Sequence, residues 1–200
     1  MSRRQTGWLA AALIMGVFGI WSMLGMVADI AAFRGGAWVE AWSFQLSKAQ
    51  TQNEFFSPQD EDWQQAYALA NLAVRLSPMN ADYREGLARI HEARFIMAPI
   101  GDPEARPERE KAIASYRDSI RLRPTWPYAH AALAYALVRA GGHDAEIESA
   151  LAEAARLGPW EPKVMEAIVD IGLDGWYRIS PASRVIVSNT LLRSQSWAAG

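Results

Sequence analysis

The sequence predicts an all-α protein, with an N-terminal transmembrane helix followed by an α-solenoid of about four helical hairpins. Two observations lead to this fold class. Residues 5–28 contain no charged side chain. Beyond them, small and apolar residues recur three and four positions apart, which places them on one face of a helix. The helices that they predict are short, so a single pair cannot bury its apolar face and must stack on neighbouring pairs.

Length and composition restrict the classes of function. The chain has 200 residues, half of them hydrophobic, which is enough for the core of one domain of ordinary size. Its net charge of −2 gives no general attraction to nucleic acid, so we expect no nucleic-acid partner. The chain has no cysteine, which excludes disulfides, thiolate metal sites and a cysteine nucleophile.

Residues 5–28 are the predicted membrane anchor and the predicted contact with the lipid bilayer. As a helix these residues extend about 36 Å, more than the roughly 30 Å core of a bilayer. The segment is longer than the apolar core of a signal peptide, and residues 28–32 make a poor cleavage site. Arg3 and Arg4 precede it, which predicts a cytoplasmic N-terminus. We therefore expect a single-pass protein of the bacterial inner membrane whose C-terminal domain is periplasmic.

The chain divides into two predicted parts, the tip and anchor at 1–33 and a helical domain at 34–200. Trp38 and Trp42 begin the domain on a helix expected to pack against the next one. That second helix follows Ser57-Pro58 and opens with the acidic residues 60–62, which suit a first helical turn. Helices are expected at 37–53, 60–76, 80–97, 104–122, 126–141, 143–157, 161–173 and 181–194. On the last of them, Val185, Ile186, Leu191 and Leu192 are expected to close the stack, while Arg184, Asn189 and Arg193 face water.

The hairpin at 109–142 shows the repeated pattern most clearly. Ala112, Tyr116 and Ser119 share one helical face, and Pro124 follows five residues later. A second helix then begins near Pro127, where a proline is tolerated in a first turn. The same four-three-five spacing occurs twice more, in Ala66, Ala70, Ala73 and Pro78, and in Ile147, Leu151, Ala154 and Pro159.

This pattern resembles the tetratricopeptide (TPR) family of helical repeats, whose 34-residue unit carries small residues at these places and a terminal proline. Pro124 and Pro159 are 35 residues apart, whereas Pro78 and Pro124 are 46 apart. The longer spacing predicts an inserted loop within 97–107, a tract rich in proline. The usual tryptophan of the repeat is replaced in this chain, so the repeats are divergent, and the resemblance covers about 37–193. Arg84, His130 and Met165 stand at its place.

The resemblance implies a concave groove that binds other polypeptides, because the first helix of each repeat lines the inner surface of such a solenoid. Repeat positions 2, 5, 9, 12 and 13 are expected to face inward. The predicted partner-binding residues are Asp82, Glu85, Arg89, Glu92, Tyr128, Tyr135, Arg139, Lys163, Glu166 and Asp170. The alternative interpretation is a solvated helix face with scattered aromatic residues.

A second resemblance covers nearly the whole chain, and the motifs that carry it lie near the C-terminus. Leu-Gly-Pro-Trp-Glu-Pro-Lys-Val at 157–164, Gly175-Trp176 and Ser-Pro-Ala-Ser-Arg at 180–184 are similar to small polysaccharide-biosynthesis proteins of the VpsP type. These are single-pass bacterial proteins found with exopolysaccharide assembly systems. The resemblance implies a membrane-anchored periplasmic scaffold for exopolysaccharide biosynthesis or export. Its partners would be other membrane or periplasmic proteins of that system, with direct contact to the polysaccharide as a further option.

Motifs for catalysis are lacking in the sequence. It has no glycine-rich phosphate loop, no Gly-x-Ser-x-Gly elbow and no His-Glu-x-x-His zinc pair. His91 falls at a packing position and is expected in the core. We therefore expect no enzymatic activity, no cofactor and no metal site. Two alternatives remain: an assembly chaperone for another envelope complex, in secretion or cytochrome maturation, and a carbohydrate-binding module that uses Trp126, Tyr128 or Trp160 for stacking.

Overall fold

A computed structural model describes residues 3–142 and 145–198, with side chains from Leu13 to Gln195 outside that gap. Within these ranges the chain forms α-helices and no β-strand, so the all-α prediction is confirmed. The helices are α1 (Arg3–Gln52), α2 (Asp60–Leu76), α3 (Ala81–Ala93), α4 (Arg106–Leu122), α5 (Pro127–Arg139), α6 (Ala145–Leu157), α7 (Pro162–Gly175) and α8 (Pro181–Ala198). Most bounds lie within a few residues of the predicted ones; the predicted start of the sixth domain helix at 143 lies outside the described residues.

The longest element, α1, is one continuous helix of 50 residues. The sequence predicted an anchor at 5–28 and a separate helix from 37, but the helix runs through Gly35 and Gly36 without a break. A Cβ at Gly35 would lie 3.4 Å from the backbone nitrogen of Ala70, so α2 approaches closely at this point. Close packing along α2 offsets the cost of roughly 1 kcal/mol that each glycine adds to a helix interior.

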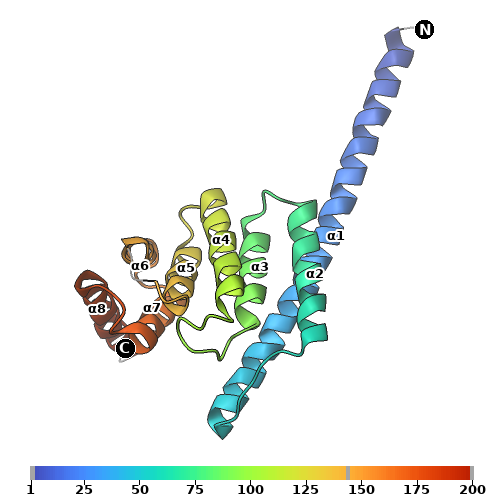
Figure 1. The fold of residues 1–200 in the computed structure, drawn as a ribbon. Helices are drawn as coiled ribbons and strands as arrows, with labels where there is room; N and C mark the ends of the chain where they lie inside the picture. The colour runs from blue at the N-terminus through green and yellow to red at the C-terminus, as the bar shows by residue number, and fades with distance from the viewer. Residues whose placement is uncertain (1–2, 143–144, 199–200) are drawn as a thin grey trace.

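The N-terminal half of α1 projects away from the other helices (Figure 1). Its large apolar side chains from Leu13 to Phe33 are exposed. In the part of the chain that the structure describes, α1 is the one helix long and apolar enough to cross a membrane. The topology and the compartment of the remaining helices stay predictions.

The other helices, α2 to α8, form the helical stack, in which neighbours along the chain lie side by side (Figure 1). Contacts also join α1 to α3, α5 to α7 and α6 to α8. Two apolar clusters hold the arrangement. One lies between α1, α2 and α3 around Trp42, Ala66 and Ile90. The larger cluster runs from α3 to α8 and is built around Tyr116, Leu151 and Ile168.

The segment between α3 and α4 differs from its prediction. The third predicted helix extended to residue 97, but α3 ends at Ala93, and turns follow up to residue 105. Two guanidinium groups donate hydrogen bonds to the backbone carbonyls of this segment. Arg109 donates to the carbonyls of Pro99 and Ala98, and Arg139 donates to those of Ile96, Phe95 and Ala98. In a continuing helix, backbone N–H groups would donate to these carbonyls; here the two arginine side chains donate instead.

Two glycines join the same segment to the end of α5. Gly101 and Gly141 have φ values of 75° and 85°, a left-handed backbone that glycine adopts at little cost. The Gly101 amide donates to the Arg139 carbonyl at 3.0 Å. A Cβ at Gly141 would lie 3.2 Å from the Cα of Gly101, so the two backbones are in contact.

The buried face of α8 differs in part from the predicted one. Val185, Leu191 and Leu192 were expected to close the stack, but their side chains are exposed. The buried face of α8 instead consists of Ser183, Val187 and Thr190. Small side chains allow close contact with α7, because a Cβ at Gly172 would collide with Val187. Ile186 is half-buried, as are Arg184 and Arg193, whereas Asn189 is exposed as predicted.

Candidate functional site

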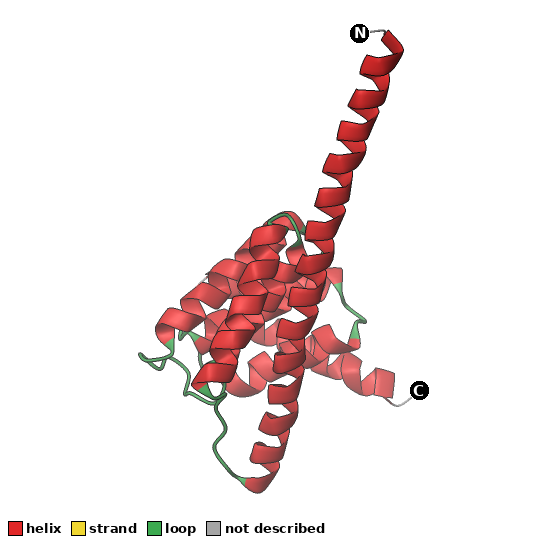
Figure 2. Cartoon of the chain, turned by 90° about the vertical axis from the view of Figure 1, so that its right-hand side faces the viewer, coloured by secondary structure: helices red, strands yellow, loops and turns green. Residues whose placement is uncertain are grey.

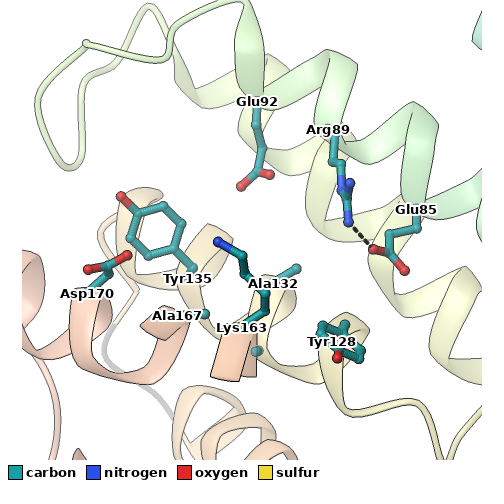
Figure 3. A pocket seen from close by; sticks show the side chains of 10 residues that line it. Glu85, Arg89, Glu92, Tyr128, Ala132, Tyr135, Lys163, Ala167 and Asp170 are labelled. Atoms are coloured by element: carbon teal, nitrogen blue, oxygen red, sulfur yellow. Dashed lines mark hydrogen bonds and ion pairs between the residues drawn. The ribbon is translucent and has the colours of Figure 1, made fainter. Parts of the chain in front are cut away.

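The candidate site is a groove of about 520 Å³ between α3, α5 and α7 (Figure 3). Its lining residues are Glu85, Arg89, Glu92, Tyr128, Ala131, Ala132, Tyr135, Lys163, Ala167 and Asp170. The three alanines are too small to fill the space between the helices, so the groove stays open. Charged and tyrosine side chains surround them. The groove therefore offers apolar contact in the middle and polar contact around it.

Helical spacing explains why these side chains point to one place. Glu85, Arg89 and Glu92 follow each other by four and three residues on α3. The same spacing joins Tyr128, Ala132 and Tyr135 on α5, and Lys163, Ala167 and Asp170 on α7. The opposite faces of these helices carry buried residues such as Ile90, Leu137 and Ile168, which fix the rotation of each helix.

The structure brings seven of the ten predicted partner-binding residues together around this groove. These are Glu85, Arg89, Glu92, Tyr128, Tyr135, Lys163 and Asp170. The other three predicted residues do not line the groove. Asp82 pairs with Arg123 at 2.7 Å, and Glu166 accepts from Lys163 at 2.7 Å. Arg139 holds the carbonyls between α3 and α4 and lines a smaller adjoining cavity of about 110 Å³. Whether any of the ten binds a partner stays a prediction.

The cations of the groove already have anionic partners. Arg89 pairs with Glu85 at 2.6 Å (Figure 3). Lys163 donates to Glu166 at 2.7 Å. Two carboxylates of the lining remain, those of Glu92 and Asp170. Neither forms an ion pair with a cation in the described part of the chain. The groove consequently has an acidic end between α3 and α7.

Glu92 has the most perturbed carboxylate of the groove. Tyr116 donates a hydrogen bond to its Oε2 at 2.5 Å. Burial raises the pKa of Glu92 to about 7, against the opposing effects of the Tyr116 hydrogen bond and of the positive charges of Arg139, Arg89 and Arg109. Glu92 thus changes its charge near neutral pH.

The wall formed by α7 is also acidic. Burial raises the pKa of Asp170, and the charges of Glu166 and Asp174 add to this rise. Tyr135 donates to Asp174 at 2.7 Å, and burial together with this bond raises the pKa of the Tyr135 hydroxyl. A ligand with a positively charged group would relieve the repulsion between these carboxylates.

The histidines do not converge on one site in the described part of the chain. His91 is buried as predicted, and its Nδ1 donates to Glu108 at 2.7 Å. Burial lowers the pKa of His91. His130 donates from Nε2 to the Pro124 carbonyl at 2.8 Å, and His143 lies outside the described residues. No cluster of three potential metal ligands occurs among the residues that the structure describes.

A second cavity, of about 480 Å³, was not foreseen from the sequence. We name it the aromatic cavity; its lining residues are Trp38, Ala41, Trp42, Gln45, Phe55, Phe56, Ser57, Pro58, Gln59 and Asp62. Trp38 and Trp42 were expected only to pack against α2. The connection after α1 folds back and adds Phe55 and Phe56, and this return is set by tertiary contacts rather than by a local motif.

The residues suggested for carbohydrate stacking lie apart from both cavities, except for Tyr128. Trp126 packs against Tyr128 at 4.8 Å between ring centroids. The guanidinium of Arg123 covers the Trp126 ring at 4.0 Å, so that ring already has a stacking partner. Trp160 is 60% exposed.

Comparisons with known proteins gave no match to a family model and no match to a curated protein. The fold and the site therefore define only a broad class: an all-helical protein with one N-terminal helix that is long and apolar enough to cross a membrane, and with an open groove on its helical stack. Any more specific function has to be argued from the groove.

Proposed function

We propose that this protein is a membrane-anchored adaptor that binds a partner polypeptide in the groove between α3, α5 and α7. The groove itself carries the proposal. It is open, it has an alanine floor, and its rim offers Tyr128 and Tyr135 beside paired charges. Tyrosine is enriched among residues that dominate protein–protein binding, because it combines a large apolar surface with a hydroxyl group.

Divergent TPR-like repeats are the architecture that we propose for the helical stack. Two features support it. The small residues of the repeated pattern, among them Ala66, Ala112 and Ala154, are fully buried. In addition, the groove is formed by alternate helices, α3, α5 and α7, as expected for the inner surface of stacked hairpins.

The cellular role that we propose is a part in exopolysaccharide biosynthesis or export at the bacterial inner membrane, with the helical stack in the periplasm. The resemblance to VpsP-type proteins supports this role, and the exposed apolar half of α1 supports the membrane attachment. Deleting the gene should reduce the amount of surface polysaccharide. Unchanged yield and chain length of the polymer would exclude the role and leave the adaptor function to be assigned to another envelope complex.

Binding in the groove can be tested by co-purification of partners from detergent-solubilised membranes. Tyr128→Ala with Asp170→Asn changes two lining side chains, and Tyr177→Ala is the matched control because that tyrosine is 91% exposed and lies outside the groove. Arg139 is unsuitable as a probe, since it holds the segment between α3 and α4. Loss of the same partner bands with the double variant alone supports the groove. Equal recovery with all three proteins would exclude it.

A carbohydrate-binding function is a second candidate, and the aromatic cavity favours it. Aromatic rings beside amide and carboxylate groups suit sugar rings, which stack on their apolar faces and form hydrogen bonds at their edges. Trp38 and Trp42 supply rings to this cavity, and Gln45, Gln59 and Asp62 supply polar groups beside them. Titration with polymer fragments should change tryptophan fluorescence, and Trp38→Phe should reduce the change. A flat titration removes this candidate.

A further inference from the structure

The segment of α1 around residue 30 has two different faces. Ala28 and Ala31 are buried, and Tyr83 at the start of α3 donates a hydrogen bond to Asp29. On the other side of the same helical turns, Ile30 and Phe33 are 52% and 78% exposed. This part of α1 therefore packs against the helical stack and also continues the exposed apolar surface of the predicted membrane span.

The sequence and the packing of α1 together locate the edge of a bilayer. The predicted span, residues 5–28, extends about 36 Å as a helix, more than the roughly 30 Å core of a bilayer, so the core ends no later than Ala28. Asp29 follows directly and already contacts α3 through Tyr83, so the helical stack begins where the core ends. Figures 1 and 2 show the turn between α2 and α3, residues 77–80, at the height where the bare part of α1 ends.

The α2–α3 turn has the chemistry of a headgroup contact. Met79 lies in this turn and is 78% exposed. Arg75, in the last turn of α2, and Arg34, next to Phe33 on α1, are exposed and form no ion pair with any described residue. An apolar side chain with cations nearby suits the boundary between acyl chains and phosphate groups.

We propose that the α2–α3 turn is a second membrane contact, in which Met79 enters the headgroup region and Arg34 and Arg75 bind lipid phosphates. This inference rests on α1 being a membrane span, as in the proposed function. Because α1 has no break between the span and the helical stack, the stack lies against the bilayer at a fixed orientation and does not hang from a flexible tether. The groove then faces its partners at a defined height.

The absence of cysteine makes a direct test simple, because each introduced cysteine is the single labelling site. Met79→Cys, Phe18→Cys and Glu104→Cys are labelled with an environment-sensitive nitrobenzoxadiazole dye in the full chain. The proteins are reconstituted in vesicles of phosphatidylcholine and phosphatidylglycerol. Phe18 lies in the span, and Glu104 is exposed in the segment between α3 and α4, at the far end of α3. Lipids with a nitroxide at a shallow acyl position serve as quenchers.

We expect quenching at positions 18 and 79 and none at 104. Quenching at 18 without quenching at 79 would overturn the second contact and leave the membrane anchor intact. No quenching at 18 would remove the anchor itself, and with it both this inference and the membrane part of the proposed function. Arg34→Gln with Arg75→Gln should lower quenching at 79 at least twofold while leaving position 18 unchanged. Unchanged quenching at 79 would exclude the role of the two arginines.

Discussion

Tyr116 on α4 donates a hydrogen bond of 2.5 Å to Glu92 on α3, and this bond joins the fully buried core to the groove. Tyr116 belongs to the larger apolar cluster, whereas Glu92 lines the cavity. The ligand-binding surface that we propose is therefore connected to the packing of the stack through one carboxylate. We therefore expect a change in the charge of Glu92 to alter stability as well as the proposed binding.

The pKa of Glu92 predicts that this carboxylate lowers stability as the pH rises. Burial raises the pKa from 4.5 to about 7, so between these values the folded protein binds a proton that the unfolded chain releases. The free energy of unfolding therefore falls as pH increases through this window. Glu92→Gln removes the effect. Relative to the parent protein, the variant should be equally stable near pH 4.5 and more stable by about 1–2 kcal/mol at pH 8, a discounted value because the groove is open to water.

Thermal unfolding of the full chain in detergent, followed by circular dichroism from pH 4.5 to 8, measures this difference. Glu104→Gln serves as the control, since Glu104 is an exposed carboxylate outside the groove, and its profile should match that of the parent. A constant difference between Glu92→Gln and the parent across the pH range would show that Glu92 does not titrate in this window.

Arg109 is predicted to be the main support of the segment between α3 and α4. Its side chain is buried, and it donates to the carbonyls of Pro99, Arg139 and Ala98 at 2.8, 2.6 and 2.9 Å. Arg109→Ala removes a charged donor from all three carbonyls, which keep only the amides of Asp102 and Gly101 and the guanidinium of Arg139 as donors. We expect a loss of about 2–3 kcal/mol in the free energy of unfolding. Arg109→Lys should recover only part of it, because one ammonium group cannot reproduce the planar fork of the guanidinium.

Hydrogen exchange distinguishes a local role for Arg109 from a general one. In Arg109→Ala the amides of residues 94–105 should exchange at least tenfold faster, and those of α7 and α8 should follow only the global loss of stability. Arg106→Ala, an exposed arginine in the first turn of the same helix, should change neither quantity. If exchange in 94–105 stays at the parent rate in Arg109→Ala, the carbonyl contacts do not hold this segment.

The sequence predicted most of the helices, because proline and acidic first turns mark their starts and the apolar spacing marks their faces. α2 at 60–76 has the predicted bounds. The two larger errors have tertiary causes. α3 ended early because Arg109 and Arg139, distant in the sequence, take its would-be helical carbonyls. α1 continued through Gly35 and Gly36 because α2 packs against it, which no local propensity reveals.

The groove was partly predictable for the same reason. Helical spacing placed Glu85, Tyr135 and Asp170 on one predicted face of their helices, and all three line the groove. The ion pairs of Arg89 with Glu85 and of Lys163 with Glu166 join residues four or three apart on one helix, a spacing that favours such pairs. The bond from Tyr116 to Glu92 joins α4 to α3, so sequence spacing could not specify it. The aromatic cavity was missed because it needs the return of residues 53–59 against α1.

The adjacent glycines Gly35 and Gly36 of α1 should respond in opposite ways to substitution. A Cβ at Gly36 meets nothing within 4 Å, so Gly36→Ala should stabilise the helix by about 0.5–1 kcal/mol. At Gly35 a larger side chain would push against Ala70 and Ala66 of α2, and Gly35→Leu should cost about 2 kcal/mol. Thermal unfolding of the full chain in detergent compares the two variants. Equal shifts for both would show that α1 and α2 are not closely packed at Gly35.

The contact of α7 with α8 depends on a glycine in the same manner. A Cβ at Gly172 would collide with Val187 Cγ1, and valine has few rotamers with which to avoid it. We expect Gly172→Ala to lower the free energy of unfolding by about 1–3 kcal/mol. Gly86 on α3 is the matched control, since a Cβ there meets nothing within 4 Å, and Gly86→Ala should be neutral or slightly stabilising.

A double variant separates the steric effect from other consequences of the Gly172 substitution. Val187→Ala removes the colliding methyl groups, so it should cost stability alone but recover most of the loss when combined with Gly172→Ala. The expected coupling free energy between the two positions is about 1 kcal/mol or more in the rescuing direction. Additive losses in thermal unfolding would mean that α7 and α8 are not in contact at these residues, and the end of the stack would need a different arrangement.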